Sequence, residues 1–103
     1  MTIAEPPLRG VTFEGRAIIA LWPHCGEVGR AHATSDIGGG ELYGALAGCL
    51  QGCYLEGYRI PEDFLQEIDE FVDDLYCDDA EDGGPDYWLN KRYIAQVRSL
   101  DDK

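Results

Sequence analysis

The chain of 103 residues is long enough for one domain with its own core and too short for two. Its hydrophobic content of 45% is too high for a disordered protein. The net charge of −12 excludes direct binding to nucleic acid or to an anionic membrane through a basic patch. No apolar run has the length of a membrane span, and the first ten residues do not resemble a secretory signal. We therefore expect a single cytoplasmic domain over residues 1–103.

The first third of the chain is expected to form an extended arm and a β-hairpin. Pro6 and Pro7 favour an extended arm over residues 1–10, because neither proline suits the interior of a helix. The apolar run near the end of residues 11–22 predicts a buried strand. After a turn that contains a glycine, residues 28–34 are expected to return as a polar, exposed partner strand.

A helix with a stripe of small residues is predicted over residues 41–58. Gly44, Gly48 and Gly52 recur at every fourth position and therefore share one face of this helix. Each glycine inside a helix costs about 1 kcal/mol relative to alanine. We expect another element to pack closely against the stripe and so to compensate for this cost.

An amphipathic helix is predicted from Pro61 to about Tyr76, with proline in its first turn. Its apolar side consists of Phe64, Ile68, Phe71, Val72 and Leu75. Its acidic side consists of Glu62, Asp63, Glu67, Asp69, Glu70, Asp73 and Asp74. An acidic, glycine-containing loop is expected to follow over residues 78–86.

The last segment, residues 87–100, fits the apolar spacing of a helix and also the alternation of a strand. We favour a strand, because an isolated two-stranded hairpin would be only marginally stable. Together these elements predict an α+β fold: a small antiparallel sheet, formed by the hairpin and a C-terminal third strand, packed against two helices.

The negative charge of the chain is concentrated in one segment. Outside residues 62–86, eight acidic and eight basic residues cancel, so this segment carries the whole net charge of −12. The segment contains no Lys, Arg or His. Its acidic residues are Glu62, Asp63, Glu67, Asp69, Glu70, Asp73, Asp74, Asp78, Asp79, Glu81, Asp82 and Asp86.

The density of carboxylates on the predicted helix is comparable with that of phosphates on DNA. Seven carboxylates from Glu62 to Asp74 give about one charge per 3 Å of helix axis, and one strand of B-DNA carries a charge about every 3.4 Å. We expect a basic nucleic-acid-binding protein as the partner. The predicted contact residues are Glu62, Asp63, Glu67, Asp69, Glu70, Asp73, Asp74, Asp78 and Asp79. The alternative is a solvated face that only keeps the protein in solution.

The cysteines leave a metal site open as a second alternative. Cys49 and Cys53 share a helix face and Cys25 adjoins a turn, but this spacing is a weak signal for zinc. The acidic loop lacks an EF-hand pattern, since Ala80 and Leu89 occupy two positions at which calcium needs carboxylates. We expect no cofactor and no metal.

Catalysis is not expected. Gly38, Gly39 and Gly40 precede a helix but lack the Lys-Ser or Lys-Thr of a phosphate-binding loop, so they are interpreted as a connector. His24 and His32 have no recognisable nucleophile beside them.

The basic residues near the C-terminus are too few to form a nucleic-acid surface beside so many acids. We expect Lys91, Arg92 and Arg98 to pair with acids within the fold or in a homodimer. A protein–protein adaptor that binds through aromatic anchors is a further alternative, with Tyr43, Tyr54, Tyr58 or Trp88 as the anchors.

In its size and charge pattern the chain resembles small acidic single-domain proteins of phages and mobile elements, among them anti-CRISPR and anti-restriction proteins that imitate DNA. The resemblance rests on the chain length, on the absence of basic residues from 61–90 and on the carboxylates of 62–74. It implies non-catalytic inhibition in the cytoplasm of a bacterial host cell. The inhibitor would occupy a basic nucleic-acid-binding groove of a defence complex such as a CRISPR effector.

Overall fold

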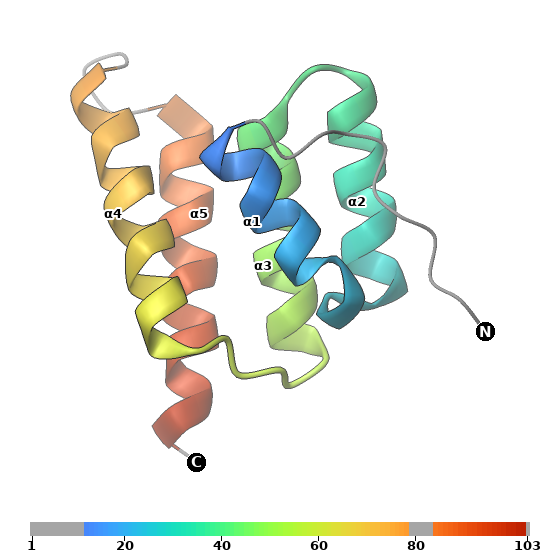
Figure 1. The fold of residues 1–103 in the computed structure, drawn as a ribbon, viewed down its shortest axis with the longest axis vertical. Helices are drawn as coiled ribbons and strands as arrows, with labels where there is room; N and C mark the ends of the chain where they lie inside the picture. Colours follow the sequence, from blue (N-terminus) through green and yellow to red (C-terminus); the bar gives the residue numbers. More distant parts are fainter. Residues whose placement is uncertain (1–11, 79–83, 103) are drawn as a thin grey trace.

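The computed structural model describes residues 12–78 and 84–102, and this part of the chain is helical without a strand (Figure 1). The helices are α1 (Phe13–Leu21), η1 (Trp22–His24), α2 (Gly26–Gly38), α3 (Leu42–Leu55), α4 (Glu62–Asp78), α5 (Gly84–Arg98) and η2 (Ser99–Asp102). The predicted α+β fold, with a hairpin and a third strand, is therefore wrong. The predicted arm at 1–10 lies outside the described residues.

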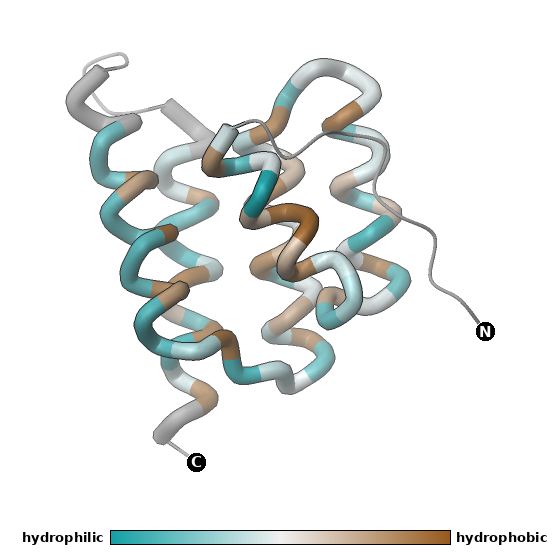
Figure 2. The backbone as a smooth tube through the Cα atoms, in the orientation of Figure 1, coloured by the Kyte–Doolittle hydropathy of each residue, from teal (hydrophilic) through white to brown (hydrophobic). Residues whose placement is uncertain are grey.

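Helix α3 forms the centre of the fold. Helices α2 and α5 lie on either side of it, α1 crosses its front, and α4 lies on the far side of α5 (Figure 1). All residues from 44 to 50 are buried, so α3 has almost no solvent-facing side. Along α4, by contrast, hydrophilic and hydrophobic residues alternate by turn (Figure 2). This pattern is typical of a helix with one buried and one solvated side.

Helix α1 replaces the predicted strand at 11–22. The side chain of Thr12 caps its first turn by accepting a hydrogen bond from the backbone N–H of Gly15 at 3.2 Å. Ala17, Ile18 and Leu21 are buried on one face, whereas Ile19 is 39% exposed. The apolar run therefore forms a helix with one buried and one exposed face. It is not a strand that is buried on both sides, as was predicted.

Helix α2 replaces the predicted second strand, because small residues bury it. Its buried residues are Gly29 and Ala33, and it has no stripe of large apolar side chains that would reveal a helical period. Helix α5 replaces the predicted third strand. Its buried positions, Asn90, Ile94 and Val97, follow the spacing of three and four residues that marks one helix face.

The prediction that another element packs against the glycine stripe of α3 is confirmed, and that element is α2. A Cβ on Gly52 would overlap the carbonyl oxygen of Cys25 and lie 2.8 Å from the Cα of Gly29. A Cβ on Gly48 would lie 2.9 Å from the ring of His32. The two helix backbones therefore approach as closely as glycine allows.

The glycines at 38–40 end α2, which confirms their interpretation as a connector. Gly40 has a φ of +79°, a conformation that side chains disfavour. The N–H of Gly40 donates to the carbonyl of Ile37, and the N–H of Glu41 donates to that of Asp36. These two bonds form a Schellman motif, which satisfies carbonyls that the end of the helix would leave unpaired.

The prediction of an amphipathic helix after Pro61 is confirmed, and α4 runs two residues beyond the expected end at Tyr76. Leu65, Ile68 and Val72 are buried on its apolar side. The prediction of a loop over 78–86 is wrong at both ends, because α4 includes Asp78 and α5 begins at Gly84. Residues 79–83 lie outside the described part. Among the described helices, none combines the length and apolar character that crossing a bilayer requires.

Candidate functional site

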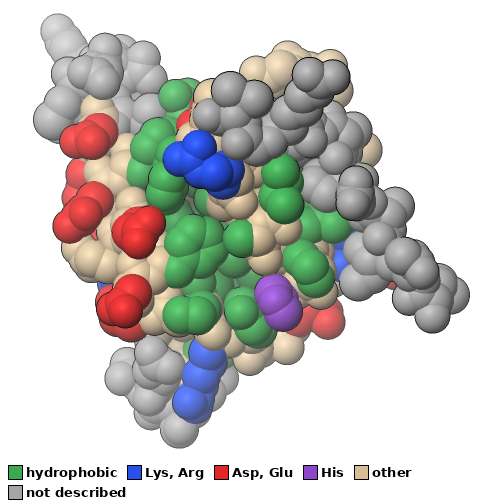
Figure 3. Space-filling model, viewed as in Figure 1, with side chains coloured by type: hydrophobic (Ala, Val, Ile, Leu, Met, Phe, Trp, Pro, Cys, Tyr) green, Lys and Arg blue, Asp and Glu red, His purple; other side chains and the backbone are tan. Residues whose placement is uncertain are grey.

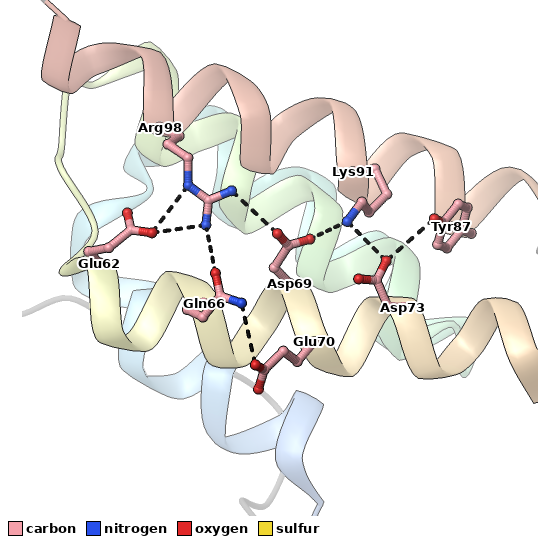
Figure 4. Close-up of polar contacts among 8 residues, drawn as sticks. All are labelled: Glu62, Gln66, Asp69, Glu70, Asp73, Tyr87, Lys91 and Arg98. Carbon is pink, nitrogen blue, oxygen red and sulfur yellow. Dashed lines mark hydrogen bonds and ion pairs between the residues drawn. The ribbon is translucent and has the colours of Figure 1, made fainter.

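The acidic side of α4 consists of two parallel rows, each with members three or four residues apart. The inner row faces α5 and consists of Glu62, Gln66, Asp69 and Asp73 (Figure 4). The outer row follows the same spacing one residue later and consists of Asp63, Glu67, Glu70 and Asp74. The structure thus separates residues that the sequence presents as one acidic face.

Arg98 binds the first half of the inner row. Its Nη2 and Nε donate to Oε1 of Glu62 at 3.0 and 3.3 Å, and its Nη1 donates to Oδ2 of Asp69 at 3.3 Å (Figure 4). Nη2 also lies 3.4 Å from Oε1 of Gln66. The end of α5 is therefore joined to the beginning of α4.

Lys91 binds the second half of the inner row. Its Nζ donates to Oδ1 of Asp69 and, at 2.9 Å, to Oδ1 of Asp73. The hydroxyl of Tyr87 also donates to Oδ1 of Asp73, at 3.4 Å (Figure 4). The prediction that basic residues near the C-terminus pair within the fold is confirmed for Lys91 and Arg98. Arg92 is exposed and forms no ion pair with the described residues.

These contacts shift the pKa values of the groups involved. Partial burial would raise the pKa of Asp69, but the hydrogen bonds and charges of Lys91 and Arg98 outweigh it, so the pKa lies below its ordinary value. Partial burial would lower the pKa of Lys91, but Asp69 and Asp73 raise it above its ordinary value. Asp69 and Lys91 thus remain charged at neutral pH, and two bases of α5 face the three carboxylates of the inner row.

The outer row differs from the inner row in having no basic partner among residues 12–78 and 84–102. Asp63, Glu67, Glu70 and Asp74 are all exposed, and no Lys, Arg or His of the described residues forms an ion pair with them. In the described part of the chain, Glu70 alone of the four accepts a side-chain hydrogen bond, from Nε2 of Gln66 at 3.3 Å. Four charges over eleven residue steps give about one per 5 Å of helix axis. The accessible charge is therefore sparser than the DNA-like density expected from seven carboxylates.

The nine predicted contact residues accordingly fall into three groups. The outer row remains available to a partner, whereas Glu62, Asp69 and Asp73 are bound to α5. Asp78 is the last residue of α4, and Asp79 lies outside the described part. Gln66 and Tyr87, which the sequence interpretation missed, complete the inner contact.

A patch of hydrophobic side chains adjoins the outer row. Figure 3 shows it between the carboxylates of α4 and helix α1. Phe71 contributes to this side of α4, with its ring centroid 4.9 Å from that of Phe13 and 5.9 Å from that of Tyr43. Phe13, Phe64 and Phe71 are only half-buried. Carboxylates and aromatic rings thus lie side by side on α4.

The three cysteines considered as metal ligands are buried thiols. No group of three or more His, Cys, Asp or Glu side chains in the described part is arranged to hold a metal ion. The Sγ of Cys25 donates to the carbonyl of Trp22 at 3.5 Å. The hydrogen bond with Cys25 and burial raise the pKa of Cys49, and burial raises that of Cys53 to about 12. These groups pack as small apolar side chains.

Both histidines have partners within the fold. His32 Nε2 lies 3.2 Å from Oδ2 of Asp36 one turn later in α2. His24 stacks on Tyr58, with ring centroids 3.9 Å apart and planes 2° apart. Neither contact includes a nucleophile.

The four aromatic residues considered as partner anchors differ in exposure. Tyr43, Tyr54 and Tyr58 are half-buried. Tyr54 and Tyr58 pack against the core, and Tyr43 lies beside Phe71. Trp88 is 57% exposed and meets Tyr87 edge-on, with ring centroids 4.9 Å apart. Only Trp88 of the four therefore offers most of its ring to a partner.

Comparisons with protein-family models, with curated proteins and with solved structures find no match. The outer row and the adjoining aromatic patch are therefore interpreted from their own chemistry.

Proposed function

We propose that this protein is a non-catalytic inhibitor that places the outer row of α4 in a basic nucleic-acid-binding groove of a bacterial defence complex, such as a CRISPR effector. The observation that carries the proposal is the contrast between the two rows. Two bases of α5 bind the inner row, and no base of the described residues binds the outer row. An external Lys or Arg would supply the positive charge that no described residue places beside the outer row.

The energetic cost of the outer row supports a functional role over a purely solubilising one. Asp63 and Glu67, Glu67 and Glu70, and Glu70 and Asp74 are like charges three or four residues apart. Each such pair destabilises a helix by about 0.2–0.5 kcal/mol. A solvated helix usually mixes charges of both signs, which avoids this repulsion.

The inner row supports the proposal in another way, because it fixes α4 in position. Lys91 and Arg98 hold α4 against α5 at both halves of the inner row. The outer carboxylates therefore project from a helix that is anchored along its length. Individual exposed ion pairs contribute only about 0.2–1 kcal/mol, so binding by the outer row would be collective and sensitive to salt.

A capture experiment with matched variants tests the proposal. The double variant Glu67→Gln, Glu70→Gln removes two outer charges, and Glu27→Gln, Glu41→Gln removes two exposed charges elsewhere. From a bacterial lysate at low salt, wild type and the second variant should capture the same nucleic-acid-binding protein, and the first variant should lose it. High salt and added double-stranded DNA should both release the captured protein. Equal capture by the two variants, or indifference to DNA, would refute the proposal.

The exposure of Trp88 favours one second candidate function, that of an adaptor that binds a protein through an aromatic anchor. Truncation of such an anchor typically costs 2 kcal/mol or more, about 30-fold in affinity. Trp88→Ala would then abolish capture while Glu67→Gln, Glu70→Gln would not. Binding through Trp88 would also change little with salt, because the contact is apolar.

A further inference from the structure

The side of α4 next to the outer row is aromatic. Phe64 lies three residues before Glu67, and Phe71 lies four residues after it and three before Asp74. Residues at these spacings are neighbours on a helix surface. The phenylalanines therefore form a row parallel to the outer row, on the side away from α5.

The aromatic row lies on a side of α4 against which no other described helix packs closely. Helix α4 approaches α5 most closely, and on its other side the rings of Phe71, Phe13 and Tyr43 bridge the distance to α1 and α3. Phe13, Phe64 and Phe71 remain half-buried. Figure 3 shows hydrophobic side chains next to the carboxylates on this face of the molecule. This apolar surface extends along α4 for about two turns, the distance between Phe64 and Phe71.

The carboxylates beside this apolar surface indicate which kind of ligand would fit it. A ligand for it needs an apolar row next to a basic row, both parallel to the axis of α4. A helix with apolar residues on one face and Lys or Arg along the edge of that face presents this arrangement. An extended basic tail, or a groove wall lined with charged side chains alone, would engage the carboxylates and leave the exposed part of the phenylalanines uncovered.

We propose that the partner element recognised by α4 is a basic amphipathic helix, which docks its apolar face on Phe13, Phe64 and Phe71 and its Lys or Arg side chains on the outer row. This inference rests on the proposed function, since it names the part of the basic partner that is bound. It adds an apolar contribution, which salt does not screen, to the collective contribution of the charges.

The test uses two fluorescent peptides of identical Lys and Leu composition. One has the apolar residues on a single helix face, and the other has them scrambled so that no face is apolar. In anisotropy titrations with the full chain, the amphipathic peptide should bind at least about tenfold more tightly than the scrambled one. Its circular dichroism should become helical on binding.

Variants separate the two contributions. Phe64→Gln should weaken the amphipathic peptide about tenfold and leave the scrambled peptide unchanged, and Phe64→Leu should restore affinity. Phe64 has no ring contact with another described aromatic residue, so its substitution disturbs the fold less than that of Phe71. Should Phe64→Gln fail to fold, the two peptides measured on the wild type still decide the question.

The outcomes distinguish this inference from the proposed function. Equal binding of both peptides, with loss in Glu67→Gln, Glu70→Gln but not in Glu27→Gln, Glu41→Gln, would overturn the helix proposal and leave a purely electrostatic surface. Indifference of both peptides to Glu67→Gln, Glu70→Gln would overturn the proposed function as well.

Discussion

Asp69 accepts a hydrogen bond from Nη1 of Arg98 on Oδ2, at 3.3 Å, which leaves its other oxygen, Oδ1, to Lys91. Its side chain is only 16% exposed, so these charges interact in a partly desolvated setting. Ion pairs of this kind depend strongly on both partners, because loss of one leaves a poorly hydrated charge behind. Asp69 therefore links the two halves of the contact between α4 and α5.

The first prediction concerns Asp69→Asn, which should lower the free energy of unfolding at neutral pH by about 1–3 kcal/mol. Because the pKa of Asp69 is lowered in the folded protein, its contribution is present above the ordinary value of 3.8 and is lost as pH falls through the folded value. Urea denaturation at neutral pH and near pH 2 should thus show a difference between variant and wild type that shrinks in acid.

Asp63→Asn is the matched control for this prediction. Asp63 is exposed and belongs to the outer row, so its neutralisation should change stability by less than about 0.5 kcal/mol. Equal destabilisation by the two substitutions, or a deficit of Asp69→Asn that persists unchanged in acid, would contradict the role assigned to Asp69.

The second prediction concerns the contact between α2 and α3. Gly52→Ala should destabilise the protein by about 1–3 kcal/mol, because the added methyl group meets the backbone of Cys25 and Gly29. Alanine is intrinsically better than glycine in a helix by about 1 kcal/mol, so the sign of the effect separates close packing from propensity. Thermal and urea denaturation provide the measurement.

Gly38→Ala supplies the comparison, since a Cβ at this position near the end of α2 meets nothing within 4 Å. It should be neutral or slightly stabilising. If Gly52→Ala is as stable as Gly38→Ala, the two helices do not approach as closely as described.

The third prediction concerns thiol reactivity. Cys25, Cys49 and Cys53 are buried, which shields all three thiols from a reagent in solution. Burial also raises the pKa of Cys53 to about 12, whereas the hydrogen bond with Cys49 lowers the pKa of Cys25. The sequence has a fourth cysteine, Cys77, and the variant Cys77→Ser removes it so that only these three thiols are measured. The native variant at pH 8 should then react only slowly with Ellman's reagent. In the unfolded protein all three thiols should react rapidly, giving the absorbance expected for three equivalents of thiol. A thiol that reacts rapidly in the native state would show that this part of the core opens.

The sequence predicted α4 well because its large apolar residues and its acids occupy opposite sides of the helix. It failed for α1, α2 and α5 for separate reasons. The apolar run before Trp22 is continuous, so it concealed that Ile19 faces solvent. Helix α2 is buried through glycine and alanine, which have no hydrophobic period. The spacing in α5 fitted two structures, and the choice of a strand depended on a hairpin that does not exist.

The division of the acidic side into two rows depends on where α5 lies, which the sequence alone does not reveal. A signal was nevertheless present. Lys91 and Arg98 are seven residues apart, as are Glu62 and Asp69, so two helices side by side would align these pairs. Because residues 87–100 were predicted to be a strand, Lys91 and Arg98 were not expected to face Glu62 and Asp69. One error of secondary structure thus concealed which carboxylates were already neutralised.

The close contact of α2 and α3 at Gly52 also indicates which residues a homologue of this protein should share. Surface charges can change at little cost, but at a position whose Cβ would overlap the backbone of the neighbouring helix every side chain destabilises the fold. A remote homologue with this architecture should therefore retain glycine there, opposite another small residue at the place of Gly29. These two positions, together with the glycines at every fourth residue of α3, form a sequence pattern. This pattern can identify distant homologues whose overall sequence identity is low.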